Sequence, residues 1–239
     1  MNILGIIPAR GGKQKLTNKN ILPLKGKPVV AYSILAAQKS LRIDRLIVST
    51  EDPCIAKIAR KFNVEIIDRP KELALETSPI DECLRHVVES LEIREGYYAD
   101  IVVEMYANVP VRKEGMIDRV IDKLIESDAN SAVSVYPVIQ YPQWVKTVDE
   151  EDYLHPFLPL SNNCRRQNLE KTFLIDGAVI AIETGILLST KGKNEIYSYM
   201  GEKIIGIIQE PWYAVEIDSE EDLIIAESLL NNEKIKAIR

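Results

Sequence analysis

Cysteine and histidine are scarce in this sequence, and their spacing excludes several kinds of site. The 239 residues include three cysteines, Cys54, Cys83 and Cys164, and two histidines, His86 and His155. No Cys-x-x-Cys pair occurs, which argues against a zinc or redox site, and distant cysteines in odd number are typical of free thiols in a reducing compartment. No HExxH sequence occurs either, so a zinc-protease site is not expected.

Long apolar runs and a strong basic charge are also missing. The apolar run at residues 3–7 is too short for a signal peptide, and no stretch approaches the roughly 20 apolar residues of a membrane span. The formal net charge of -6 argues against a sequence-independent nucleic-acid binder, which needs a basic face. We therefore expect a cytoplasmic protein that binds neither membrane nor nucleic acid.

Strand and helix patterns alternate over the first 137 residues. Apolar runs indicate buried strands, and apolar residues at i, i+3, i+4 and i+7 indicate helices, most clearly over 79–94. The expected strands are 3–7, 46–50, 64–67, 100–105, 132–136, 173–182 and 204–208, and the expected helices are 29–40, 51–62, 79–94, 114–127 and 219–230. This order predicts an α/β, Rossmann-like, mostly parallel sheet with helices on both faces. We find no linker, so residues 1–239 are expected to form a single domain.

The alternation stops at residues 138–170. This segment contains three prolines and four aromatic residues and has no helical stripe. It is expected to form a hairpin or an arm outside the main sheet.

The loop after the first strand is the strongest local signal. Two adjacent glycines allow a close approach of backbone N–H groups to an anion, and nearby cations neutralise its charge. Ligands of open α/β sheets bind beyond the carboxyl ends of the strands, where this loop lies. The GxxxxGK[ST] and GxGxxG signatures are absent, which disfavours a kinase or a dehydrogenase, and a solvated basic turn is the alternative. The loop residues concerned are Arg10, Gly11, Gly12, Lys13, Lys15, Lys19 and Asn20.

Two further segments follow predicted strands. Arg69 follows the strand at 64–67, while Thr77 and Ser78 precede the amphipathic helix and could simply cap it. The segment YANVPVR, which contains Tyr106, Asn108 and Arg112, follows the strand at 100–105. Both lie at the edge of the sheet where a ligand would bind.

Two charged clusters occur late in the chain. The adjacent Arg165 and Arg166 can bind a carboxylate or a phosphate, or can be an exposed pair. If the tripeptide at 216–218 is extended as in a strand, Glu216 and Asp218 point to the same side and suit Mg²⁺ shared with substrate phosphates. The alternative is an acidic cluster at the N-terminus of the last helix, where Ser219 and Asp222 resemble a capping box.

Taken together, these segments resemble the CMP-sugar synthetases, the acylneuraminate cytidylyltransferases, over almost the whole chain. The similar segments, in order, are IIPARGG with PLKGKPVVAYSI, LIVSTEDPCIAKIA, RPKELALETSPIDECLRH, RRQNLEKTFLIDGAVIAI and EIDSEEDLIIAE. One such segment is weak evidence, but five in the right order indicate this superfamily.

The resemblance implies a reaction in which the anomeric hydroxyl of a 2-keto sugar acid attacks the α-phosphate of CTP and pyrophosphate leaves, with Mg²⁺ as cofactor. It also implies a homodimer in which residues 138–170 are the dimerisation arm. The implied catalytic residues are Arg10, Lys13 or Lys15, and Lys19; the implied nucleotide-binding residues are Arg10, Gly11, Gly12, Asn20, Arg69 and Ser78; the implied sugar-binding residues are Tyr106, Asn108, Arg112, Arg165, Arg166, Gln167 and Asp176; and the implied metal ligands are Glu216 and Asp218.

The departures from the family pattern fall mainly on the acceptor side. Tyr106 stands in place of a glutamine, Asp176 in place of an asparagine, and Glu216 in place of an aspartate. We therefore expect a cytidylyltransferase for an unusual acidic sugar. The alternatives are a nucleotidyltransferase of the same fold that uses another nucleotide such as GTP, and a catalytically weak nucleotide-sugar-binding protein.

Overall fold

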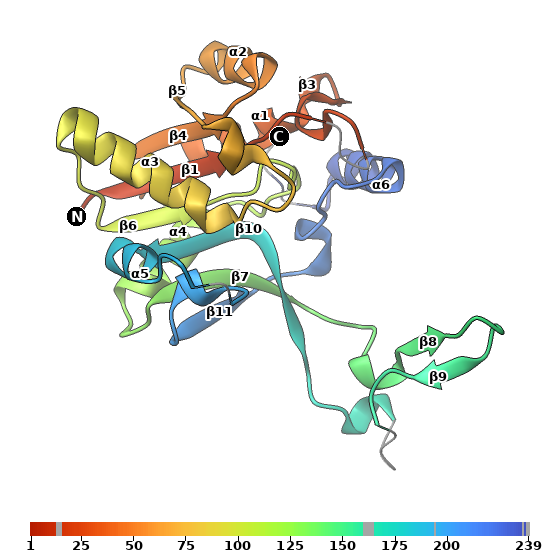
Figure 1. The fold of residues 1–239 in the computed structure, drawn as a ribbon. Helices are drawn as coiled ribbons and strands as arrows, with labels where there is room; N and C mark the ends of the chain where they lie inside the picture. Colours follow the sequence, from red (N-terminus) through yellow and green to blue (C-terminus); the bar gives the residue numbers. More distant parts are fainter. Residues whose placement is uncertain (13–15, 160–164, 194, 236, 238–239) are drawn as a thin grey trace.

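A seven-stranded sheet forms the centre of the molecule (Figure 1), with the strand order β11-β7-β10-β6-β1-β4-β5. The computed structural model describes residues 1–12, 16–159, 165–193, 195–235 and 237. The strands are β1 (Ile3–Pro8), β4 (Arg45–Thr50), β5 (Glu65–Asp68), β6 (Ile101–Glu104), β7 (Ser131–Pro137), β10 (Phe173–Glu183) and β11 (Ile204–Ile208). All run in one direction except β10, which pairs antiparallel with both β6 and β7. The prediction of a mostly parallel sheet is confirmed.

Helices cover both faces of this sheet. On one face α1 (Val29–Gln38), α2 (Pro53–Lys61) and α4 (Met116–Ile125) pack against a cluster that contains Ile7, Val48 and Val103. On the other, α3 (Ile80–Glu95) and α5 (Thr184–Ser189) pack against Leu4, Ile6 and Val102. Neighbouring residues of one strand thus pack in opposite clusters, which explains the unbroken apolar runs at residues 3–7 and 101–103. The last helix, α6 (Glu220–Asn231), packs with α1 in a third cluster.

Local residues define the helix starts at both ends of the chain. Pro28 is the N-cap of α1, and its fixed φ suits that position. The Asp52 carboxylate caps α2 by accepting from the backbone N–H of Cys54 at 2.7 Å. Ser219 and Asp222 form a complete capping box at the start of α6. The alternative that Thr77 or Ser78 caps α3 is excluded, because Pro79 is the N-cap of α3 and no side chain caps it.

Residues 138–159 and 165–170 form an arm outside the sheet. The arm leaves β7, carries a short hairpin of β8 (Lys146–Val148) and β9 (Leu154–Pro156), and returns into β10; in Figure 1 it extends away from the helices. Its apolar side chains are open to solvent, with Leu154 67% and Phe157 61% exposed. These side chains are therefore not buried by the described part of the chain.

The remaining elements are short. They are a two-stranded ribbon of β2 (Pro23–Leu24) and β3 (Lys27–Pro28), and the 3-10 turns η1 (Lys19–Ile21), η2 (Lys71–Ala74), η3 (Pro142–Trp144), η4 (Arg166–Asn168), η5 (Ser198–Met200) and η6 (Pro211–Tyr213). Within the described part of the chain, no helix has the length and apolarity needed to cross a bilayer.

Candidate active site

A cleft of about 220 Å³ lies beyond the carboxyl ends of β1 and β6. This is the edge at which ligands of open α/β sheets bind. Its lining comes from segments far apart in the sequence: Pro8, Arg10, Lys19, Asn20, Arg69, Leu73, Leu75, Glu76, Ser78, Pro79, Ile80, Cys83, Tyr106, Ala107, Asn108 and Glu216. Eight of the predicted site residues are therefore brought together in one cleft: Arg10, Lys19, Asn20, Arg69, Ser78, Tyr106, Asn108 and Glu216.

The loop after β1 is held against the start of α2. The backbone N–H of Gly11 donates to the Glu51 carboxylate at 2.7 Å. A Cβ at Gly11 would lie 2.3 Å from the Asp52 carboxylate, so only glycine fits here. Gly12 has φ +105°, again a glycine conformation. Lys13 and Lys15, predicted to meet the phosphates, lie outside the described residues.

Arg10 and Asn20 join this loop to the rest of the cleft. The buried Asn20 amide donates to the Arg10 carbonyl at 2.9 Å, and its Oδ1 has no hydrogen-bond partner among the described groups. The Arg10 guanidinium reaches across the cleft and donates from Nη1 to the Leu75 carbonyl at 3.0 Å. Arg10 thus faces the predicted base-binding segment with donors left for an anion.

The acidic tripeptide at 216–218 meets Asn108 and Lys19 at one wall of the cleft. It is irregular rather than a strand, but its two carboxylates still lie side by side. One nitrogen, Asn108 Nδ2, donates to Glu216 Oε1 at 3.1 Å and to Asp218 Oδ1 at 3.3 Å. The ammonium of Lys19 is bound to Asp218. Burial and the charge of Asp218 raise the pKa of Glu216, while the Asn108 amide and Lys19 lower it.

Arg69 and Ser78 face the cleft from either side of η2. Arg69 is buried, and its Nη2 donates to the Ser49 carbonyl at 2.7 Å. The Ser78 hydroxyl donates to the Glu72 carbonyl at 2.7 Å, which closes the turn that leads into α3. Both side chains are therefore fixed by backbone carbonyls before any ligand binds.

Tyr106 lies directly against the backbone of Gly177. Its N–H donates to the Gly177 carbonyl at 3.0 Å, and a Cβ at Gly177 would lie 2.4 Å from the Tyr106 ring. Gly177 also has φ +62°, which side chains disfavour. Burial raises the pKa of Tyr106, as do the carboxyl groups of Glu104 and Glu216, so its phenol is a neutral wall of the cleft.

Arg112 and Asp176 lie in the core and do not line the cleft. Arg112 is 1% exposed and donates to the Ala178, Val109 and Tyr106 carbonyls and to the Ser33 hydroxyl. Burial lowers the pKa of Arg112 to about 9, although Asp176 opposes that change. Arg112 therefore fixes the 106–111 loop from inside, and the predicted contact with the sugar is not supported by this placement.

The Asp176 carboxylate accepts hydrogen bonds from three neighbouring groups of the protein. They are the Ser134 hydroxyl, the Ala178 N–H at 3.0 Å and the Gln209 amide at 2.6 Å. Burial raises the pKa of Asp176, and these donors lower it. Asp176 therefore shapes β10 beside Gly177, and its predicted sugar contact is also not supported by this placement.

Arg165, Arg166 and Gln167 lie on the arm, in and just before η4, and their side chains are exposed. They do not line the cleft of their own chain. In Figure 1 the arm extends away from the sheet and its helices.

Glu104, which belongs to none of the predicted site segments, is fully buried. Its hydrogen bond from the Tyr199 hydroxyl is 3.0 Å long. The signal was available, since Glu104 is the one charged residue in the apolar run at 101–105. A charged residue inside a strand buried on both faces points to a functional or positioning role.

A Rossmann-like sheet with this cleft, in which cations face a pair of carboxylates, is the arrangement of a nucleotidyltransferase. The chain belongs to the cytidylyltransferase family, whose profile, described as "Cytidylyltransferase", matches residues 4–204.

Two relatives act on acidic sugars by name. The chain is 30% identical over 155 residues to the CMP-N,N'-diacetyllegionaminic acid synthase of Legionella pneumophila subsp. pneumophila, a match that covers 64% of this chain and 66% of the relative. It is 25% identical over 228 residues to an N-acylneuraminate cytidylyltransferase of Streptococcus agalactiae serotype V, covering 94% of this chain and 52% of the relative. The chain thus spans about half to two thirds of the length of these two relatives.

Among solved structures, the fold is similar to that of a CMP:2-keto-3-deoxy-manno-octonic acid synthetase complexed with CTP. The TM-score is 0.72 and the identity 17%, and the match covers 96% of this chain and 98% of the other. At this identity the likeness supports the fold.

Proposed function

We propose that this protein transfers CMP from CTP to an acidic keto-sugar of the nonulosonate type and releases pyrophosphate. The observation that carries this proposal is the convergence of Arg10, Lys19, Glu216 and Asp218 at one cleft of a cytidylyltransferase fold. The names of the relatives support an acidic sugar as acceptor.

The chemistry needs positioning and charge neutralisation more than covalent catalysis. Arg10 and Lys19 would neutralise the triphosphate, while Arg69 and Ser78 would contact the base from η2 and the start of α3. Tyr106 and Asn108 would face the acceptor, whose anomeric hydroxyl attacks the α-phosphate. The bond from the α-phosphate to the bridging oxygen breaks, pyrophosphate leaves with that oxygen, and the proton of the attacking hydroxyl is released to water.

We further propose Mg²⁺ as the cofactor, held by Glu216 and Asp218. Their carboxylates share the Asn108 amide as a donor, so they offer two hard oxygen ligands side by side. Over the described ranges, no cluster of three or more His, Cys, Asp or Glu is present. Two carboxylates without further protein ligands fit an ion that completes its shell with water and phosphates. When bound, the ion supplies further neutralisation of the phosphate charge.

Release of pyrophosphate tests this proposal. We expect release with CTP and Mg²⁺ in the presence of one acid from a panel of eight-carbon and nine-carbon keto-sugar acids, and background release with ATP, GTP and UTP. Release with another nucleotide only would keep the enzyme class and overturn the choice of base. No release with any pair, together with tight CTP binding by calorimetry, would favour a nucleotide-sugar-binding protein.

The arm supports a homodimer as a further part of this proposal. Its exposed apolar residues suit burial against a second copy, and Arg165 and Arg166 would then reach the cleft of the partner and bind the sugar carboxylate. The two free cysteines of the described chain, Cys54 and Cys83, suit a reducing compartment, so we place the enzyme in the cytoplasm.

The double substitution Leu154→Ser with Phe157→Ser is expected to convert the dimer into a monomer. It removes two large exposed apolar side chains of the arm and leaves the sheet unchanged. Sedimentation velocity measures the mass. Ile93→Ser is the matched control, because Ile93 is 84% exposed on α3 and lies on the body. A monomeric wild type, or a double variant that stays dimeric, would contradict the arm as the interface.

A further inference from the structure

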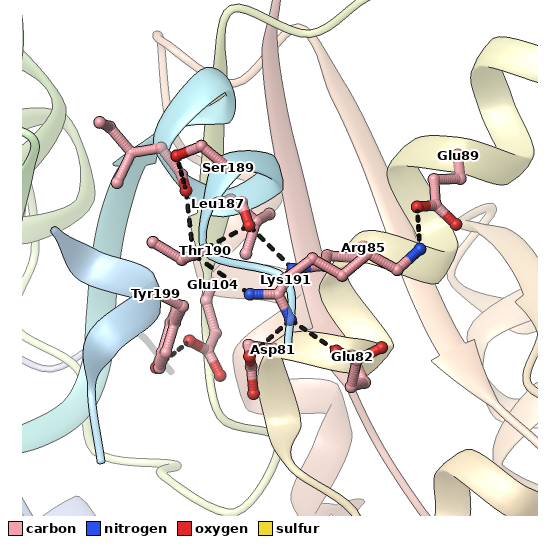
Figure 2. A network of polar contacts seen from close by, with 11 residues as sticks. Asp81, Glu82, Arg85, Glu89, Glu104, Leu187, Ser189, Thr190, Lys191 and Tyr199 are labelled. Carbon is pink, nitrogen blue, oxygen red and sulfur yellow. Dashed lines mark hydrogen bonds and ion pairs between the residues drawn. The ribbon is translucent and has the colours of Figure 1, made fainter. Parts of the chain in front are cut away.

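Glu104 is a carboxyl group enclosed by the core. It lies at the end of β6, where its backbone neighbours are Ile6 of β1 and Ile180 of β10, and its side chain is 0% exposed. Its Oε2 accepts a hydrogen bond of 3.0 Å from the Tyr199 hydroxyl of η5 (Figure 2). Its Oε1 is buried and, among the described groups, has no hydrogen-bond partner.

No cation of the described chain forms an ion pair with Glu104. The nearby guanidinium of Arg85 is bound elsewhere, to Asp81 at 2.5 Å, Glu82 at 2.8 Å and the Leu187 carbonyl at 2.8 Å (Figure 2). An ionised Glu104 would therefore be a buried charge without a counter-charge, which is costly. A proton on the carboxyl removes this cost and leaves one O–H donor.

The titratable groups that face Glu104 come from three elements. Asp81 and Cys83 lie on α3, Tyr199 on η5, and Tyr106 at the end of the same strand. Burial, followed by the charge of Asp81, raises the pKa of Glu104 to about 8, while the Tyr199 hydroxyl lowers it. The arrangement therefore favours the neutral acid at neutral pH.

The elements around this carboxyl also form the cleft. Tyr106 follows Glu104 by two residues and lines the cleft, as does Ile80, which precedes Asp81 in α3. Ionisation of Glu104 would place a negative charge behind the wall that, under the proposed function, receives an acidic sugar. The ionised carboxylate of Glu104 would also repel the carboxylate of Asp81 on α3, whereas the neutral form does not.

We propose that Glu104 is a positioning residue, which carries a proton in the working enzyme and, through Tyr199 and the strand end at Tyr106, keeps the acceptor side of the cleft ready for an anionic sugar. This role rests on the proposed function, because it concerns the acceptor of that reaction. The proton on Glu104 can be tested without any substrate.

Thermal unfolding of the full chain from pH 6 to 9.5 tests the proton. The pKa of Glu104 is raised in the folded state, so the stability that its neutral form contributes is fully present below the unfolded pKa of 4.5, falls as pH rises above that value, and is lost once pH has passed about 8. Glu104→Gln keeps a neutral side chain at every pH. We expect the Tm of Glu104→Gln minus that of the wild type to increase by at least about 3 °C over this range.

Two variants sharpen this measurement. In Tyr199→Phe, the transition of Glu104 is expected at higher pH, because the hydroxyl that lowers its pKa is removed. Glu89→Gln is the control, since it removes an exposed carboxylate of α3 that pairs with Lys191 (Figure 2), and its Tm difference is expected to stay constant. A constant difference for Glu104→Gln as well would overturn the proposal.

Kinetics of pyrophosphate release test the positioning role. Between pH 7 and 9 the KM for the acceptor is expected to rise about fivefold more in the wild type than in Glu104→Gln. The ratio of wild-type to variant kcat, and the ratio of their KM values for CTP, are expected to be the same at both pH values. If the wild type and Glu104→Gln show the same pH dependence of the acceptor KM while their Tm difference depends on pH, Glu104 has a structural role only. That outcome would overturn the proposed positioning role. Absence of the reaction itself would remove the positioning role but leave the result on the proton intact.

Discussion

Asp218→Asn is expected to lower pyrophosphate release at least about 100-fold at saturating CTP and acceptor, the size of effect seen when one group that stabilises transferring charge is removed. Asp218 shares the Asn108 amide with Glu216 and holds the Lys19 ammonium. The substitution therefore removes one of the two proposed magnesium ligands and frees Lys19 from its partner. Glu216→Gln is expected to give a loss of similar size.

The fold must be shown to survive these changes. Glu220→Gln removes one exposed negative charge from the first turn of α6, two residues after Asp218, and is expected to keep at least half of the activity. Circular dichroism and Tm should agree among the three variants within the effect of a surface substitution. An Asp218→Asn enzyme with near wild-type release would show that this carboxylate has no part in the reaction.

Gly177→Ala is expected to raise the acceptor KM at least about 10-fold and to lower Tm by several degrees. The new Cβ would lie 2.4 Å from the Tyr106 ring, and the backbone φ of +62° adds strain. Since Tyr106 lines the cleft, its displacement changes the acceptor side. Steady-state kinetics with the acceptor found in the panel would measure it.

Gly192→Ala tests the effect of backbone strain at a positive φ without the steric clash that Gly177→Ala would create. Gly192 has a similar φ of +83°, but a Cβ there meets nothing within 4 Å. It is expected to lose stability through strain alone and to keep the wild-type acceptor KM. If both alanine variants change KM equally, the contact between Gly177 and Tyr106 is not what shapes the acceptor side.

The sheet and its helices were predictable because local patterns decide them. Runs such as residues 3–7 are apolar at every position, which only a strand covered on both faces requires, and the stripe on α3 has a single helical period. The place of β10 between β6 and β7 was not predictable. That order depends on pairing between segments about 40 and 80 residues apart in the sequence, which no local pattern records.

The part of the candidate site that strand direction determines was predictable from the sequence. Parallel strands end at one edge, so the loops that carry Arg10 and Asn108 had to meet there. Arg112 and Asp176 could not be placed in this way. The residue type of a charged side chain does not show whether the side chain faces a ligand or the core. The carbonyl that accepts from Arg112 and the hydroxyl that donates to Asp176 come from segments distant in the sequence.

The arm joins two strands, and one of them, β10, also supports a wall of the cleft, because its Gly177 packs against Tyr106. β7 leads into the arm, and β10 returns from it in register with β7 at Phe173, Leu174 and Ile175, just before a shift in pairing and Gly177. An insertion in the hairpin turn at 149–153 would leave that register unchanged. One extra residue inside β10, between Phe173 and Asp176, would turn Asp176 out of the core if the pairing at Phe173 were kept. Insertions at the tip of the arm are therefore expected to be tolerated, while the strand at its base has to keep a fixed length as long as Asp176 and Gly177 support the cleft.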